Sequence, residues 1–232
     1  MNELWPWLTL VLLGAYHGIN PAMGWLFAVA LGLQERSRMA VLQALVPIAI
    51  GHAVSIVLAV TIIGLAQVLI PPDVVRLACG GVLIGFGVYR LVRQTHPRWV
   101  GMRVGFRDLI AWSLLMSTAH GAGLMLTPVL FQVRASGHTV LGVCSLGVRV
   151  AEAAQTVPTA SRAAVSTAAL WVDTGLAVVS MHTVGMFVVM GVVAVVVFEK
   201  VGLAILRRAW FNLDLVWAAA LVCTGVLTLS IF

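Results

Sequence analysis

Four histidines lie inside long apolar stretches of the sequence, where ionisable side chains are rare. They are His17, His52, His120 and His182, four of the six histidines in the chain. An imidazole inside a bilayer needs a polar partner or a wet cavity, so such residues are candidates for a functional site. Neutral imidazole binds Ni, Co, Cu and Zn, whereas Mg and Ca prefer oxygen ligands. The four histidines therefore predict a site for one transition-metal ion, with hydrogen bonding between helices as the alternative role.

A predicted helix break adds Asn20 to the candidate site. Asn20 follows His17 by three residues and stands directly before Pro21. Proline lacks an amide proton and disfavours helical geometry in the residue before it. We therefore expect the first apolar helix to break near the bilayer centre. A break there is tolerated only where it is buried in protein or lines a cavity, and its carbonyl groups and Asn20 become possible ligands.

Three methionines are weaker ligand candidates. Met116 precedes His120 by four residues and Met186 follows His182 by four, so each pair shares a helix face. Thioether and imidazole together suit Cu(I). Met23, just after the predicted break, is the third candidate. Methionine is also a common apolar filler, and packing is its more frequent role.

The composition requires these residues to be positioned by membrane helices. The 232 residues are 61% hydrophobic and 9% charged, with a mean hydropathy of +1.06. These values exclude soluble enzymes, nucleic-acid-binding modules and secreted disulfide scaffolds. A crossing helix needs about 20 apolar residues, so we predict an all-α integral membrane protein with six transmembrane helices. The predicted segments are 8–33, 40–70, 75–92, 109–133, 168–198 and 213–232.

The residues between these segments set the predicted topology. Alternate loops carry ten and four Lys and Arg residues, and the positive-inside rule then places both termini outside the cytoplasm, in a bacterial inner membrane. The basic residues are first an orientation signal, and they give no support to nucleic-acid binding. The stretch 132–168 has no apolar run long enough to cross, so we expect an extramembrane loop there, with a re-entrant helix as the alternative.

The two halves of the chain share an ordered pattern. His-Gly occurs at His17 and His120, and His-x-Val occurs at His52 and His182. The third match is Cys-x-Gly-Val-Leu, which begins at Cys79 and at Cys223. This order predicts a repeat of three helices, covering 1–108 and 109–232. Because three is odd, the second unit enters the membrane from the opposite side. Inverted repeats of this kind are typical of secondary transporters.

Two sequence motifs carry a resemblance to a known family. The stretches GAYHGINPAMGW, at 14–25, and GHAVS, at 51–55, resemble the nickel/cobalt transporters of the lysine-exporter superfamily. The resemblance implies a six-helix transporter of a transition-metal cation, with His17 and His52 as the matching positions. The nickel/cobalt proteins carry H-A-x-D-x-D-H where this sequence reads HGINPAM, without carboxylates or a second histidine. A softer or monovalent ion, or a small solute, is therefore also compatible with the site.

Three other functions use the same residues. The histidines could be permanent ligands of an intramembrane metal- or haem-binding enzyme or redox protein. Ser117 lies near His120 in sequence, as a serine hydrolase would need, but the G-x-S-x-G motif is absent. The third alternative is a structural or assembly role with no substrate, in which the histidines form hydrogen bonds between helices. A homo-oligomer is compatible with any of these functions. The leading prediction is a transporter whose partners are the lipid bilayer and a metal ion.

Overall fold

The chain folds into helices joined by turns, and the structure, a computed structural model, describes residues 4–92, 105–135, 159–201 and 213–230. No strand occurs in these ranges, so the predicted all-α class is confirmed for the part of the chain described. The elements are α1 (Trp5–Ile19), the 3-10 turn η1 (Pro21–Met23), α2 (Trp25–Glu35), α3 (Arg38–Leu69), α4 (Pro72–Val92), α5 (Phe106–Ala119), α6 (Ala122–Met125), α7 (Thr127–Ala135), α9 (Thr159–Val196), the π-helical turn η3 (Val197–Val201) and α10 (Leu213–Ser230).

Three helices in the described ranges are long and apolar enough to cross a membrane. They span Arg38–Gln67, Pro72–Val92 and Thr174–Lys200. A fourth crossing is made if the bent pair Phe106–Ala119 and Ala122–Val133 acts as one span. A membrane protein is therefore supported, with three or four candidate crossings where the sequence predicted six. The first predicted segment is not a single span, because a helix break divides it into α1 and α2.

The first predicted segment is two helices, not one continuous crossing. The helix α1 ends at Ile19, and Asn20 takes an extended conformation with φ −68° and ψ 118°. The side chain of Asn20 then caps the turn η1, and Gly24, at φ 115°, begins α2. A positive φ costs glycine little, which allows the chain to turn here. The break predicted from Pro21 is confirmed.

The segment 109–133 is also broken, at the second His-Gly pair. The helix α5 ends at Ala119, His120 is its C-cap, and Gly121 has φ 67°. The chain then continues through the short helix α6 into α7, with a bend of 50° between the two arms. The two segments that carry His-Gly thus share a helix break close to the histidine.

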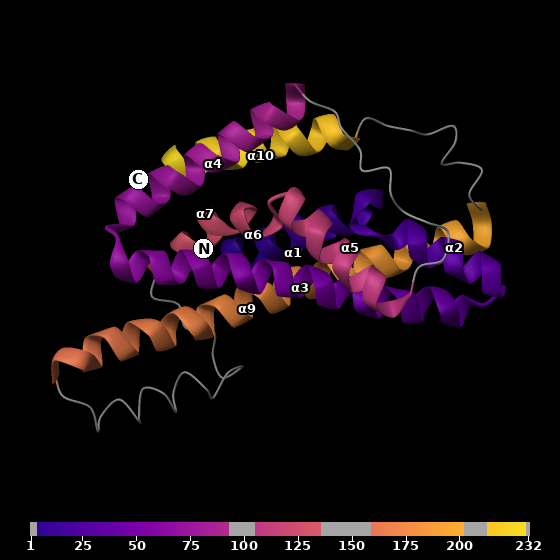
Figure 1. Cartoon of the computed structure of the whole chain (residues 1–232), viewed down its shortest axis with the longest axis horizontal. Helices are drawn as coiled ribbons and strands as arrows, with labels where there is room; N and C mark the ends of the chain where they lie inside the picture. The colour runs from indigo at the N-terminus through magenta and orange to yellow at the C-terminus, as the bar shows by residue number, and fades with distance from the viewer. Residues whose placement is uncertain (1–3, 93–104, 136–158, 202–212, 231–232) are drawn as a thin grey trace.

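The long helix α3 runs along the middle of the molecule, whereas α9 joins it with its C-terminal part and extends away from the other helices at its N-terminal end (Figure 1). Ser37 caps the start of α3 by accepting a hydrogen bond from the Ala40 amide, and the helix stops before Pro71. The helix α9 begins at Thr159, nine residues before the predicted start at 168, and so includes the last part of the predicted loop 132–168. Residues 136–158 of that loop lie outside the described ranges.

The helices α4 and α10 form a closely packed pair along one side of the bundle (Figure 1). Glycines allow this approach. A Cβ atom at Gly87 would lie 3.0 Å from the Ala218 carbonyl oxygen, and one at Gly225 would lie 3.0 Å from that of Gly80. The indole of Trp217 in α10 is 2% exposed and packs with Leu83 of α4 and with Met125. Trp217 thus connects the helix pair to the centre of the bundle.

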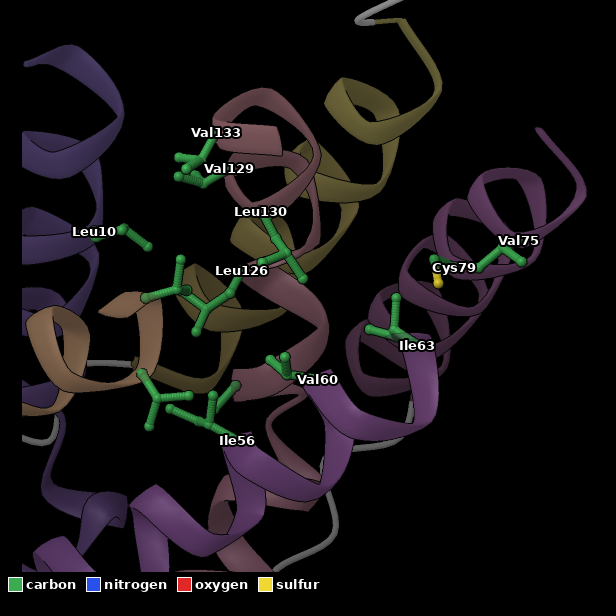
Figure 2. Packing of buried hydrophobic residues seen from close by; sticks show 13 residues of the cluster. Leu10, Ile56, Val60, Ile63, Val75, Cys79, Leu126, Val129, Leu130 and Val133 are labelled. Atoms are coloured by element: carbon green, nitrogen blue, oxygen red, sulfur yellow. The ribbon is translucent and has the colours of Figure 1, made fainter. Parts of the chain in front are cut away.

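Two apolar clusters fill the interior between α1, α3 and α9. Each is named after one of its residues, Leu10 of α1 for the first and Trp25 of α2 for the second. The Leu10 cluster includes Ile56 and Leu126, and Figure 2 shows it gathered between α1, α3, α4 and α7. The Trp25 cluster includes Ile48 and Met190, where α2 meets α3 and α9. The two clusters lie at different positions along α3 and α9. In each of these helices a histidine, His52 or His182, lies in sequence between the members of one cluster and those of the other.

Candidate metal centre

Three of the four predicted histidines meet in the centre of the bundle. The ring centroids of His17 and His182 are 4.8 Å apart, those of His52 and His182 5.4 Å, and those of His17 and His52 5.5 Å. Each side chain has no exposed surface. The three residues come from α1, α3 and α9, so the fold brings together positions up to 165 residues apart in sequence.

Glycines set the distance between the helices that carry these rings. A Cβ atom at Gly14 would overlap the carbonyl oxygen of His182, and one at Gly18 would lie 2.5 Å from the carbonyl oxygen of Met186. The backbones of α1 and α9 therefore touch on both sides of His17. Similarly, a Cβ atom at Gly51 in α3 would overlap the carbonyl oxygen of Ile110 in α5. Small residues that permit such close approach are typical of membrane-helix contacts.

The fourth histidine, His120, contacts Trp217, which in turn contacts His17. The centroid of the Trp217 indole lies 4.5 Å from that of His17 and 5.4 Å from that of His120. Its Nε1 donates a hydrogen bond of 2.9 Å to the carbonyl oxygen of His120, at the break in the helix. The ring of Tyr16 stacks on the Trp217 indole, with ring centroids 5.3 Å apart and an interplanar angle of 8°.

Trp217 was not among the residues that the sequence predicted for the site. The indole is almost completely buried, at 2% exposure. A buried tryptophan usually finds a partner for its N–H, and here that partner is the carbonyl of His120. The sequence contains little signal for this role, because a tryptophan near a helix end is common in membrane proteins.

The hydrogen bonds of the rings fix which nitrogen can act as a ligand. The Nδ1 atom of His17 lies 2.8 Å from the carbonyl oxygen of Leu13, and that of His120 lies 2.7 Å from the carbonyl oxygen of Met116. A carbonyl only accepts, so Nδ1 donates in both rings, and in the neutral imidazole the lone pair is then on Nε2. Metal-ligating histidines usually donate their other N–H to a carbonyl or carboxylate in this way.

Ser117 forms a hydrogen bond with His52. The sequence had indicated His120 as its neighbour. The Nδ1 atom of His52 and the Oγ atom of Ser117 share a hydrogen bond of 2.6 Å, and Ser117 has no exposed surface. The same α3–α5 contact contains a hydrogen bond of 2.7 Å from the Ser113 hydroxyl to the Ile48 carbonyl oxygen. One helical turn further on, Ser55 and Thr118 share a hydrogen bond of 3.0 Å.

Several buried ring nitrogens have no hydrogen-bond partner. These are Nε2 of His17, Nε2 of His52 and both ring nitrogens of His182. The Leu10 carbonyl lies near the His182 ring but outside hydrogen-bond geometry. Buried polar groups are nearly always hydrogen-bonded, and an unpartnered one calls for a physical explanation such as an ion or a water. The neighbouring rings of His17, His52 and His182 each have at least one buried nitrogen without a hydrogen-bond partner.

The separations of the three rings match those of a coordinated set, whereas their orientations do not. A metal–nitrogen bond of about 2.1 Å and tetrahedral ligand angles place imidazole centroids about 5.2 Å apart. The observed separations, 4.8, 5.4 and 5.5 Å, lie on both sides of that value. The rings of His52 and His182 are nearly parallel, at 16°. Within the described residues, no group of three or more His, Cys, Asp or Glu is arranged to hold a metal ion as it stands.

The other predicted ligands have different surroundings. The side-chain oxygen of Asn20 accepts a hydrogen bond of 3.0 Å from the Ala22 amide and so caps η1. Met186 is fully buried in the Trp25 cluster, as an apolar filler would be. Met116 and Met23 are also buried, and the carbonyl of Met116 accepts the hydrogen bond from His120.

The three-histidine cluster, defined as His17, His52 and His182, is enclosed along the helix axes by apolar residues. In α1, His17 lies between Leu10 and the break that leads to Trp25, the residues for which the two clusters are named. In α3, His52 lies between Ile48 and Ile56, one member of each cluster. In α9, the same holds for His182, which has Val178 on one side and Met186 on the other. Apolar side chains thus separate the cluster from both ends of the bundle.

The comparisons with known proteins identify no relative of this chain. No protein-family model matches the sequence, and neither a curated protein nor a solved structure similar to it was found. The geometry of the three-histidine cluster is therefore the basis for assigning a function.

Proposed function

We propose that this protein is a secondary transporter that carries a transition-metal cation, bound by His17, His52 and His182. The observation that carries the proposal is the meeting of three buried imidazole rings, 4.8 to 5.5 Å apart, from three helices. Ionisable residues at such depth usually belong to a substrate or ion pathway. His120, which shares the Trp217 indole as a contact with His17, is the fourth candidate ligand.

In this proposal the cation is bound between the three rings, whose separations suit coordination. The His182 ring, whose nitrogens have no hydrogen-bond partner, would turn so that one of them faces the same point as Nε2 of His17 and His52. The Leu10 and Trp25 clusters act as apolar barriers on the two sides of the ion. Transport then requires each barrier to open in turn, as in alternating access.

The broken helices support the transporter class. Discontinuous helices near the bilayer centre, with binding groups at the break, are common in secondary transporters. Here, breaks follow His17 by three residues and coincide with His120. The shared pattern is compatible with two inverted three-helix units, six crossings, termini outside the cytoplasm and a bacterial inner membrane. The resemblance to nickel/cobalt transporters agrees with the same class.

The alternative of a haem-binding protein is less well supported by the ring contacts. Two axial histidines must face each other across the porphyrin plane. The three rings instead contact one another directly, in edge and stacked arrangements, and Trp217 packs against His17. A compact site for a single ion agrees better with this packing.

A flux assay tests the proposal. The purified protein is reconstituted into liposomes that contain a metal-sensitive dye, and Ni, Co, Cu or Zn is added outside. We expect flux of at least one of these ions, and a reduction of about tenfold or more in His17→Ala, His52→Ala and His182→Ala. His96→Ala, in a predicted loop, is the control and should keep wild-type flux. Absence of flux for all four metals, or unchanged flux in the three folded variants, contradicts the proposal.

A further inference from the structure

The three-histidine cluster has no described negative charge near it. The buried polar side chains in the described ranges are all His, Asn, Ser or Thr. The four acidic residues whose side chains are described, Glu35, Asp73, Asp108 and Glu199, are all exposed. The ligands and their hydrogen-bond partners, such as Ser117 and the Leu13 carbonyl, are neutral when the imidazoles are neutral.

The remaining four acidic residues have side chains outside the described part. Glu3 and Glu152 fall outside the described ranges altogether, and Asp173 and Asp214 lie in the helices α9 and α10. Asp173 precedes His182 by nine residues, which is about 13 Å along a helix axis. Asp214 lies three residues before Trp217, which contacts His17.

A neutral site distinguishes strongly between ions of different charge. The desolvation cost of an ion grows with the square of its charge, so a divalent ion costs roughly four times as much to bury as a monovalent ion of similar size. Imidazoles donate lone pairs but supply no compensating charge. Without a carboxylate or thiolate beside it, a divalent ion leaves two uncompensated charges inside the bilayer.

We infer that the cation is a monovalent d10 metal ion, Cu(I) or its analogue Ag(I), and not a divalent ion. This inference rests on the proposed function and names the substrate class of the same site. Copper is among the metals that imidazole binds well, and Cu(I) is a soft ion. The three rings supply three neutral nitrogen ligands, which leaves a single uncompensated charge.

The test compares ions that have the same electrons and differ in charge. Cu(I) and Zn(II) form one such pair, and Ag(I) and Cd(II) form another. Dissociation constants of the full-length protein in detergent are measured by competition with chelators of known affinity, with Cu(I) kept reduced under anaerobic conditions. We expect the monovalent member of each pair to bind at least about tenfold more tightly. Equal or tighter binding of Zn(II) and Cd(II) overturns the inference.

An added carboxylate gives a second test. Ser117→Asp places a negative charge beside His52, and Ser117→Asn is the neutral control of the same size. We expect Ser117→Asp to shift the ratio of Cu(I) to Zn(II) affinity toward Zn(II) by about tenfold or more, and Ser117→Asn to leave it near the wild-type value. An identical ratio in both folded variants contradicts the charge argument.

The same measurements separate this inference from the proposed function. Tight Zn(II) or Ni(II) binding that requires the three histidines, with weaker Cu(I) binding, rejects the inference and retains the transporter site. Absence of binding for every ion rejects both. Asp173→Asn and Asp214→Asn are expected to preserve the preference for the monovalent ion. Its loss in either variant shows that a carboxylate belongs to the site and also overturns the inference.

Discussion

Substitution of Gly18 by alanine tests whether helix spacing sets the geometry of the three-histidine cluster. A Cβ atom at Gly18 would lie 2.5 Å from the Met186 carbonyl oxygen, where ordinary contacts begin at 3.4 Å. The helices α1 and α9 must therefore separate by about 0.9 Å, the difference between these two distances. Metal–ligand distances tolerate only about 0.2 Å. A displacement of about 1 Å at a functional site can reduce its performance about a hundredfold.

The assay is metal binding by chelator competition, together with thermal unfolding in detergent. We expect Gly18→Ala to weaken binding by about tenfold to a hundredfold, with an overpacking cost to stability of about 1–3 kcal/mol. Gly81→Ala is the matched control, because a Cβ atom at that glycine meets nothing within 4 Å. Wild-type affinity in folded Gly18→Ala, or an equal loss in Gly81→Ala, would refute the reasoning.

Three further perturbations test separate parts of the site. Ser117→Ala removes the hydrogen bond that orients His52, and should weaken metal binding by about tenfold with little change in folded yield; unchanged affinity would contradict the positioning role. Trp217→Phe removes the N–H donor to the His120 carbonyl and should lower the free energy of unfolding by about 1–2 kcal/mol, measured by thermal or denaturant unfolding in detergent; an unchanged unfolding midpoint would count against this bond. Lower pH should weaken metal binding in titrations, because protons compete with the metal for the imidazole nitrogens, and binding that is independent of pH would exclude histidine ligands.

The sequence predicted the elements better than the contacts between them. Each of the six predicted apolar segments is helical in its described residues, although only three or four candidate crossings are supported, and Pro21 correctly predicted the break after Ile19. The number of crossings is less certain from sequence, because a stretch such as 8–33 has the length of one span and the fold of two shorter helices. Apolar length alone does not reveal where the helix axis changes direction.

The meeting of the histidines follows from features that a single sequence only partly contains. The positions of His17, His52 and His182 near the middle of their stretches indicated a common depth, but depth does not specify which helices are neighbours. The approach of α1 to α9 depends on Gly14 and Gly18 facing that helix. The same limit explains why Ser117 pairs with His52, and why Trp217 was missed.

The most direct test of a metal site at the three-histidine cluster is the metal content of the purified protein. The protein is incubated with Cu(I) under anaerobic conditions, and in a second sample with Zn(II), then washed and analysed for metal per chain. We expect one ion per chain in the wild type, and less than about a tenth of that in folded His17→Ala, His52→Ala and His182→Ala. A wild type that retains neither metal, or three variants that retain as much as the wild type, would contradict a metal site at these histidines.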